Sequence, residues 1–497
     1  MAESAGRRWL LLAVVSAGLL LITLDNSILY AALPTLVEEL GASSAQSLWI
    51  INAYPVVMAG LLLGSGTLGD RVGHRRMFLT GLVVFGAASL AAALSPTPEA
   101  LIAARAFLAV GAAAMMPATL ALIRVTFADE RERNVAIAVW GSLAIVGSAL
   151  GPIVSGLLLQ SFWWGSVFLV NVPVVVVALV ATLVLAPGGG ADPGKHWDLV
   201  SSLLALVALV GLVFAIKETA KATPSPVAAG VALVAAAAGG WAFARRQRRL
   251  PDPLLDFAIF RNPAFLSGVL AAGFSMFAVA GLQLVTTQRF QLVEGFTPLR
   301  AGVLVAAVAL GALPTAVAGG ATLHRIGLLP IVAGGLALST VGTVLVLLHM
   351  PLLVTGLLIA GAGLGAAMSV ASSAIMGNVP VRRAGMASSV EEVSYEFGSL
   401  IAVALLGSLL SAVYSATVRL PPGTPEEARD SLDAALALAG EGTEGDALVA
   451  AASEAFDGAY GAVVLVVAGV LAVGTVATGV LLRRHGPGSA LSGPASR

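Results

Sequence analysis

The sequence predicts an all-α integral membrane protein whose chain crosses the bilayer about fourteen times. Of its 497 residues, 58% are hydrophobic and only 11% are charged, whereas a soluble domain carries about 25% charged residues. The mean hydropathy is correspondingly high, at +0.95. Apolar runs of about 18 residues or more recur along the chain, and each is long enough to cross ~30 Å of hydrocarbon as a helix.

The predicted spans follow one another with mostly short polar connections. The first begins directly after Arg7 and Arg8 and is too long for a signal peptide, so we expect it to remain as a membrane helix. Residues 245–262 are basic and then broken by prolines, which indicates a junction between the eighth and ninth spans. In order, the spans cover residues 9–33, 48–68, 77–95, 100–123, 135–160, 163–186, 198–216, 226–244, 263–288, 299–322, 328–348, 351–377, 385–413 and 457–482.

The distribution of basic residues predicts the orientation. An even number of spans puts both termini on one side of the membrane. Of the 27 Lys and Arg residues, 20 fall on the side of the N-terminus, six fall on the other side, and Arg105 lies within a span. Because cytoplasmic loops carry an excess of Lys and Arg, we expect both termini to be cytoplasmic.

Composition also excludes several functions. The chain has no Cys, which rules out disulfides, thiol catalysis and Cys-ligated metals. Its five His share no metal-ligand spacing, and its net charge is zero, so neither a metal site nor a nucleic-acid surface is indicated. There is no nucleotide-binding motif or catalytic nucleophile motif. We therefore expect no enzymatic activity, no cofactor, no metal and no ATP-driven transport.

Three carboxylates interrupt the thirteenth predicted span. Glu391, Glu392 and Glu396 lie in the segment 385–412, which has no other charge. A charged side chain at the centre of a membrane helix costs roughly 2.5–3.5 kcal/mol on insertion scales, so such residues face a water-filled cavity, hold a proton or meet a cation. Glu392 and Glu396 share one helix face, whereas Glu391 lies about 100° away on the face of Tyr395. This pattern indicates transport of protons or cations.

Two further charges fall inside predicted spans. Asp25 lies in the first span, where it either bonds to the backbone or Asn26 or serves as a titrating or cation-contacting group. Arg105 is the sole basic residue inside the fourth span. Its long side chain either reaches the cytoplasmic face or lies near a carboxylate and tunes its protonation, since a cation favours the ionised form of an acid.

The connection between the second and third spans carries a specific motif. Residues 66–76 read Gly-Thr-Leu-Gly-Asp-Arg-Val-Gly-His-Arg-Arg. The glycines permit a tight turn and close helix approach, and Asp70 can cap a helix or pair with arginines. This sequence resembles the signature loop of the major facilitator superfamily, from which it differs at His74. The resemblance implies a conformational latch formed by Gly66, Gly69, Asp70, Arg71, Gly73, Arg75 and Arg76.

Other segments extend the resemblance over nearly the whole chain. Residues 24–34 resemble the first-span motif of the fourteen-span drug:proton antiporters. The segment with Gly151, Pro152 and Gly156 resembles the fifth-span antiporter motif, with Ser155 as a departure. Residues 164–173 match the start of the sixth span, and Val-Glu-Glu-x-x-Tyr-Glu-x-Gly at 390–398 resembles the thirteenth span of quaternary-ammonium and multidrug exporters.

The resemblance implies a major facilitator fold with three parts. Residues 1–190 would form an N-terminal six-helix bundle, and residues 263–497 a C-terminal six-helix bundle with a long outer loop at 414–456. Residues 191–262 would form a linker with two additional membrane helices. The outer loop is either a solvated connection or an extracellular cap, and its residues 425–439 have the pattern of an amphipathic surface helix.

The function implied by the resemblance is proton-coupled efflux by alternating access. The substrates would be lipophilic, often cationic compounds such as quaternary ammonium biocides, dyes and antibiotics. The protein would act as a monomer in the lipid bilayer of a bacterial cell (inner) membrane. The residues that would couple protons to transport and contact the substrate are Asp25, Arg105, Glu391, Glu392 and Glu396. Since carboxylates and aromatic faces attract cations, the cavity would also present Tyr30, Trp49, Tyr54, Tyr395 and Phe397.

Two alternatives stay open at the level of sequence. The same motifs serve a dedicated exporter of a single metabolite or antibiotic. A membrane enzyme or sensor is more remote, because no soluble catalytic domain or catalytic motif is present.

Overall fold

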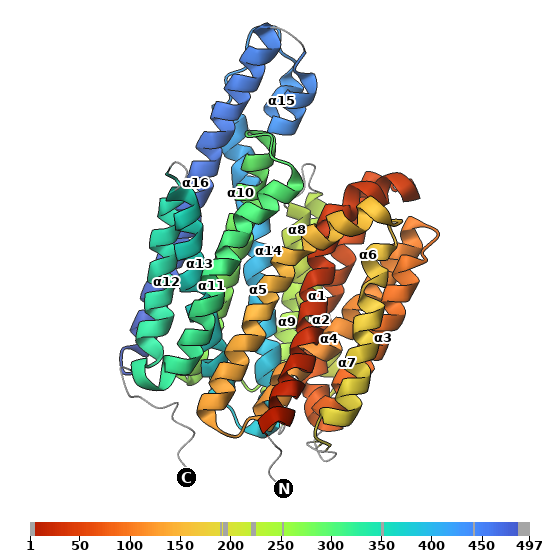
Figure 1. The fold of residues 1–497 in the computed structure, drawn as a ribbon, viewed down its shortest axis with the longest axis vertical. Coiled ribbons are helices and arrows are strands. Elements are labelled where there is room, and N and C mark those ends of the chain that lie inside the picture. The colour runs from red at the N-terminus through yellow and green to blue at the C-terminus, as the bar shows by residue number, and fades with distance from the viewer. Residues whose placement is uncertain are drawn as a thin grey trace.

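The computed structural model describes residues 5–188, 191, 197–219, 225–250, 253–348, 352–440 and 443–485. Within these residues the protein is helical and contains no strand (Figure 1). The helices in chain order are α1 (Ala5–Leu40), α2 (Ser44–Val72), α3 (His74–Ala93), α4 (Pro98–Thr126), α5 (Glu130–Ser161), α6 (Ser166–Leu169), α7 (Asn171–Leu185), α8 (Leu199–Thr219), α9 (Pro226–Gln247), η1 (Phe257–Arg261), α10 (Pro263–Leu292), α11 (Pro298–Ile326), α12 (Leu328–Leu345), α13 (Leu352–Gly377), η2 (Val381–Arg383), α14 (Ala384–Thr417), η3 (Glu426–Arg429), α15 (Leu432–Leu438) and α16 (Thr443–Leu482).

These helices account for the predicted spans and confirm the all-helical membrane fold. Thirteen segments of the described chain are long and apolar enough to cross a bilayer. The fifth predicted span coincides with α5, a 32-residue helix outside those thirteen that packs along α1 and α11. In Figure 1, α1 begins and α16 ends at the same, lower end of the molecule. We refer to this as the terminal end, and to the opposite end, which carries α15, as the cap end.

The apolar side chains form two large cores. One lies among α1 to α7 and the other among α10 to α16. The first core extends onto α13 and α14 through Ile375, Met386 and Val390. Close packing of α5 on α11 adds to this junction, because a Cβ atom on Gly320 of α11 would lie 2.6 Å from the carbonyl oxygen of Asn134 on α5. The two groups of helices are therefore joined near the terminal end.

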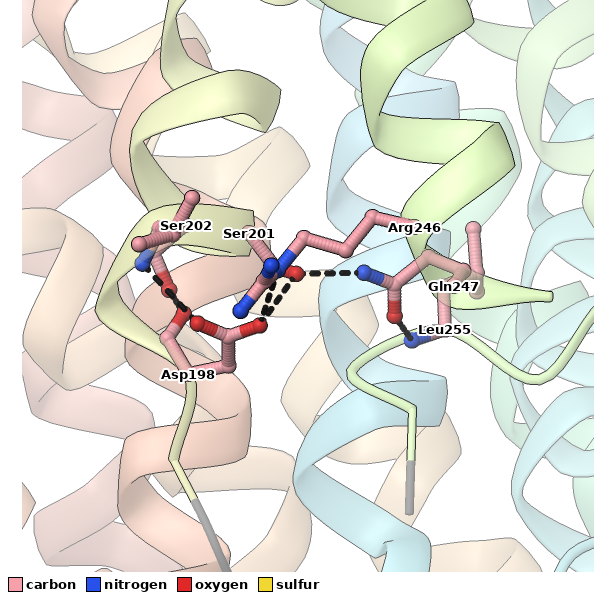
Figure 2. A network of polar contacts seen from close by, with 7 residues as sticks. Asp198, Ser201, Ser202, Arg246, Gln247 and Leu255 are labelled. Atoms are coloured by element: carbon pink, nitrogen blue, oxygen red, sulfur yellow. Dashed lines mark hydrogen bonds and ion pairs between the residues drawn. The ribbon is translucent and has the colours of Figure 1, made fainter. Parts of the chain in front are cut away.

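Helices α8 and α9 pair with each other through a polar network at their ends (Figure 2). Arg246 Nε donates to Asp198 Oδ2 over 2.6 Å, and Ser201 Oγ donates to the same oxygen over 2.8 Å. The hydrogen bond from Arg246 lowers the pKa of Asp198 to about 2. Gln247 Nε2 donates to Ser201 Oγ over 2.7 Å, and its Oε1 accepts from the Leu255 N–H. The network joins the start of α8 to the end of α9 and to the segment that follows.

The α8–α9 pair is attached to α2 along one side. Trp197 Nε1, just before α8, donates to the carbonyl oxygen of Gly64 on α2 over 3.0 Å. Farther along, the ring of Phe214 on α8 lies 6.1 Å from that of Trp49 on α2. Polar and aromatic contacts thus hold α8 at two separated points of α2.

The segment predicted as an outer loop is more helical than expected. α14 continues to Thr417 and α16 begins at Thr443, 14 residues before the predicted start at 457. The reason is an apolar face on this extension, where Leu448, Ala452 and Phe456 are buried. Within the predicted amphipathic stretch 425–439, η3 and α15 are helical and bury Ala428, Leu432 and Ala435.

Candidate functional site

A buried ion pair joins α1 and α4. Arg105 Nη1 lies 2.6 Å from Asp25 Oδ2, and both side chains have no exposed surface. The guanidinium carbon of Arg105 sits 4.7 Å from the centre of the Tyr54 ring, which adds a cation–π contact. Arg105 therefore does not reach the membrane surface, and Asp25 is not merely bonded to its own helix. Sequence analysis singled out both charges without pairing them.

Asn171 completes the surroundings of Asp25. Its Nδ2 donates to Asp25 Oδ1 over 2.8 Å and lies 3.3 Å from Ser89 Oγ, and the Asn171 side chain is fully buried. Asn171 begins α7, so the carboxylate of α1 is held by donors from both α4 and α7. Arg105 Nη2 and Asn171 Oδ1 lack hydrogen-bond partners in the described part of the chain. The site thus retains one donor group and one acceptor atom that can form hydrogen bonds with a water molecule or a ligand.

The carboxylates of α14 form a second buried group. Glu391 and Glu392 are 0% and 1% exposed, and Glu396 is half-buried. Glu391 Oε1 accepts from Ser372 Oγ of α13 and from the Tyr395 hydroxyl, the latter over 3.0 Å. Glu391 Oε2 and Glu392 Oε1 have no partner among the described residues. Two carboxylates are therefore buried side by side with oxygens available for a proton or a cation.

The predicted cavity aromatics separate into two groups. Tyr395 bonds to Glu391, and the buried Tyr54 lies within electrostatic range of Asp25, Arg105 and Glu396. Tyr54 is therefore close to charges on both α1 and α14. By contrast, Trp49 is 44% exposed and packs against α8, and Phe397 packs in a small apolar cluster of α2, α8 and α14. The side chain of Tyr30 lies outside the described part of the structure.

The motif at the end of α2 contacts the start of α14. Asp70 Oδ1 accepts from the Gly385 N–H over 2.9 Å, and the Asp70 side chain is buried. A carboxylate at a helix N-terminus is stabilised by the free N–H groups and the helix dipole. A Cβ atom on Gly66 would lie 2.3 Å from the Gly385 carbonyl oxygen, so only glycine allows this approach. Ser389 Oγ adds a hydrogen bond to the carbonyl oxygen of Leu62 over 2.8 Å.

The other residues of this motif shape and anchor the connection. Gly73 ends α2 and starts α3 with φ of 97°, a conformation that favours glycine. Gly69 packs against His74, whose Nε2 lies 3.4 Å from Asp70 Oδ1. Arg75 Nη2 donates to the carbonyl oxygen of Leu183 near the end of α7 over 2.7 Å. Arg71 and Arg76 are exposed.

The glycines of the fifth-span motif differ in their surroundings. A Cβ atom on Gly151 would lie 2.3 Å from Ser27 Oγ, so this glycine permits the close crossing of α5 and α1 two residues from Asp25. A Cβ atom on Gly156 would meet no atom within 4 Å. The side chain of Pro152 lies outside the described part.

Sequence analysis did not select Asn171, Ser372 or Ser389 as site residues. Asn171 lies in a motif that was recognised only as the start of a span. Ser372 belongs to a group of serines at 369, 372 and 373, whose i, i+3, i+4 spacing places a polar stripe on an otherwise apolar helix. That stripe is the signal from which Ser372 could have been found. In the described residues, no group of three or more metal-ligating side chains could hold a metal ion.

Comparison with known proteins identifies the family. The model of the Major Facilitator Superfamily matches residues 15–403. The methyl viologen resistance protein SmvA of Salmonella typhimurium is 36% identical over 467 residues, covering 90% of this chain and 93% of that protein. The multidrug efflux pump LfrA of Mycolicibacterium smegmatis is 36% identical over 492 residues, covering 96% and 97%.

Solved structures agree on the fold. The human organic anion transporter MFSD10 superposes with a TM-score of 0.64 at 16% identity, covering 94% of this chain and 100% of that one. The proton:xylose symporter XylE gives a TM-score of 0.58 at 12% identity, with 94% and 95% covered. The family match and the relatives, together with the shared fold, show that this chain belongs to the Major Facilitator Superfamily of membrane transporters.

Proposed function

We propose that this protein is a proton-coupled antiporter that exports lipophilic, often cationic compounds by alternating access. The observation that carries the proposal is the burial of Glu391 and Glu392 on α14, with one oxygen of each left without a described partner. A buried carboxylate is costly unless a proton or a cation compensates its charge. One pair of groups can therefore hold protons in one state and a cationic substrate in another.

The Asp25 site supports the same exchange from the other group of helices. Asp25 is ion-paired with Arg105, and Tyr54 lies within range of this pair and of Glu396. Tyr54 is therefore influenced by the charge of Glu396 on α14 as well as by the Asp25–Arg105 pair. We propose that Asp25, Arg105, Glu391, Glu392 and Glu396 together couple protons to substrate, with Tyr54 and Tyr395 contacting the cation.

The names of the relatives support the substrate class. SmvA is named for methyl viologen resistance and LfrA for multidrug efflux. Methyl viologen is an organic dication, which is the kind of molecule that paired carboxylates and aromatic rings attract. We therefore propose transport of organic cations, with no catalytic role for the carboxylates.

The contacts at the terminal end support alternating access. Asp70 and Gly66 of α2 contact the start of α14, and α5 packs closely on α11 as a second junction between the two groups of helices. We propose that residues 1–190 and 263–497 are two bundles that rock against each other, and that this contact opens to admit substrate. We also propose that the terminal end is cytoplasmic, and that the protein acts as a monomer in the bacterial inner membrane.

In the proposed cycle, substrate enters when the terminal end is open and binds the ionised carboxylates. Release follows when the cap end is open and external protons bind the same groups. A protonated carboxyl group loses its charge attraction for a cation, so proton binding displaces the substrate.

The experiment is efflux of a fluorescent organic cation from proteoliposomes with an imposed pH gradient. Glu391→Gln, Glu392→Gln and Glu396→Gln are compared with Glu444→Gln, an exposed acid on α16. We expect gradient-driven efflux in wild type and in the Glu444 variant, and its loss in at least one variant of α14. Wild-type levels of efflux and proton flux in all three α14 variants would overturn the proposal.

A further inference from the structure

Ser372 of α13 stands directly beside the α14 carboxylates. Its side chain is 2% exposed, and its Oγ lies within hydrogen-bond distance of Glu391 Oε1 and, over 3.3 Å, of the Met368 carbonyl oxygen of its own helix. The single hydroxyl proton is donated to the carboxylate, which is the nearer and the charged acceptor. The Tyr395 hydroxyl donates to the same oxygen over 3.0 Å and lies 3.4 Å from Ser372 Oγ. The three side chains therefore form a closed triangle with two donors directed at one carboxylate oxygen.

The triangle makes the two oxygens of Glu391 unequal. Oε1 is occupied by two hydroxyl groups, whereas Oε2 has no partner among the described residues. Since a hydrogen bond to a charged group is directional and strong, these donors fix the carboxylate plane. Oε2 is then the atom left to bind a proton or a cation.

The two donors also differ in origin. Tyr395 is four residues from Glu391 on the same helix, so it moves with the carboxylate. Ser372 comes from α13, so its hydrogen bond ties the orientation of Glu391 to a second helix. Glu392 receives no such bond at Oε1, which distinguishes the two neighbouring acids.

We propose that Ser372 is a positioning residue that orients Glu391, holding Oε1 within the helix pair and presenting Oε2 to the transported proton or cation. This inference rests on the proposed function, because it names how one carboxylate of that site is held. It predicts that the Ser372 hydroxyl matters for cation binding although it touches no substrate.

The neighbouring serine supplies a matched control. Ser373 is 1% exposed, and its Oγ bonds to the Ser369 carbonyl oxygen of its own helix over 3.2 Å. Ser373→Ala therefore removes a buried hydroxyl of the same helix turn without touching Glu391. Ser372→Thr keeps the hydroxyl group, and Ser372→Ala removes it.

The test is equilibrium binding of tetraphenylphosphonium to detergent-purified protein, without any gradient. We expect Ser372→Ala to weaken binding about tenfold or more, while Ser372→Thr and Ser373→Ala stay within about twofold of wild type. In a Glu391→Gln background, Ser372→Ala should add no further loss, because the hydroxyl acts through that carboxylate. Equal affinities for Ser372→Ala and Ser373→Ala, or additive losses in the double variant, would overturn the proposal.

A second measurement needs no ligand. The infrared band of the Glu391 carboxyl group is assigned as the band lost in Glu391→Gln. We expect this band to shift in Ser372→Ala and to stay in place in Ser373→Ala, and an unshifted band would overturn the proposal. Neither measurement depends on transport. Absence of pH-driven efflux in wild type would therefore contradict the proposed function alone, and the shift of the Glu391 infrared band would still test the role of Ser372.

Discussion

Arg105 is buried without exposed surface between the carboxylate of Asp25 and the ring of Tyr54. An isolated buried charge is far more costly than a paired one, so each member of this ion pair depends on the other. The side chain of Asn171 adds a neutral donor from α7. The stability of this part of the protein therefore depends on the pair as a unit.

Replacing Arg105 alone should be strongly destabilising. We expect Arg105→Met to lower the free energy of unfolding by about 3–5 kcal/mol, because Asp25 is left as an unpaired buried charge. Arg105→Met combined with Asp25→Asn should recover much of this loss. Thermal unfolding in detergent measures the stability of the single and the double variant, and Arg261→Met, at an exposed position, is the control. If the double variant is less stable than Arg105→Met, the pairing argument is wrong.

At the scale of elements, α2 contacts both the α8–α9 pair and α14, in addition to the packing of α5 on α11. Its Gly64 carbonyl accepts from Trp197 before α8, and its Asp70 accepts from the first turn of α14. Beyond α9, Asp256 pairs with Arg383 just before α14 over 2.6 Å. The α8–α9 pair is thereby attached both to α2 and to the start of α14.

The close approach of α2 and α14 should not tolerate a side chain. A Cβ atom on Gly385 would lie 2.2 Å from the Gly66 carbonyl oxygen, so Gly385→Ala must push the two helices apart. We expect loss of most transport and greater access of a thiol reagent to a Cys placed at Ser389, which is possible because the chain has no native Cys. Gly407→Ala is the matched control on α14, where a Cβ atom meets nothing within 4 Å. Equal labelling in the two variants would contradict this account.

The hydrogen bonds that join α8 and α9 predict a pH dependence. The pKa of Asp198 is lowered to about 2 by the hydrogen bond from Arg246, below the roughly 3.9 of a free Asp. A lowered folded-state pKa gives stability that is fully present above the unfolded value and is lost as the pH falls toward the folded value.

We therefore expect wild type to exceed Asp198→Asn in melting temperature by a constant margin from about pH 8 to 5, and by a shrinking margin below about pH 4. Thermal unfolding across this range measures it, with Asp446→Asn as an exposed control. A margin that stays constant down to pH 2 would show that the Asp198 carboxylate does not contribute in this way.

For the whole molecule, hydropathy was sufficient to predict the helical membrane fold, because each span must satisfy its own backbone hydrogen bonds. Charges inside spans were equally informative, since Asp25, Arg105, Glu391 and Glu392 are all buried in the structure. The sequence around each charged residue did not identify the residues that it contacts. Asn171 lies 146 residues from Asp25, and Gly385 lies 315 residues from Asp70, so only the packing of distant helices brings them together.

Aromatic residues were the least predictable part of the site. Trp49 and Tyr54 are five residues apart on α2, yet Tyr54 contacts Arg105 while Trp49 packs on α8. The two side chains differ in their surroundings because they lie on different faces of α2, and each face packs against a different helix. The sequence of α2 alone does not show which helix covers which face. The early start of α16 was missed for a similar reason, because α15 packs against this part of the helix.

The central claim is that one set of buried carboxylates binds either protons or an organic cation. The most direct measurement is proton release when tetraphenylphosphonium is added to purified protein in weakly buffered solution with a pH indicator. The account predicts proton release from wild type near neutral pH, and none from a variant in which Glu391, Glu392 and Glu396 are all replaced by Gln. Cation binding to wild type without any proton release would contradict it.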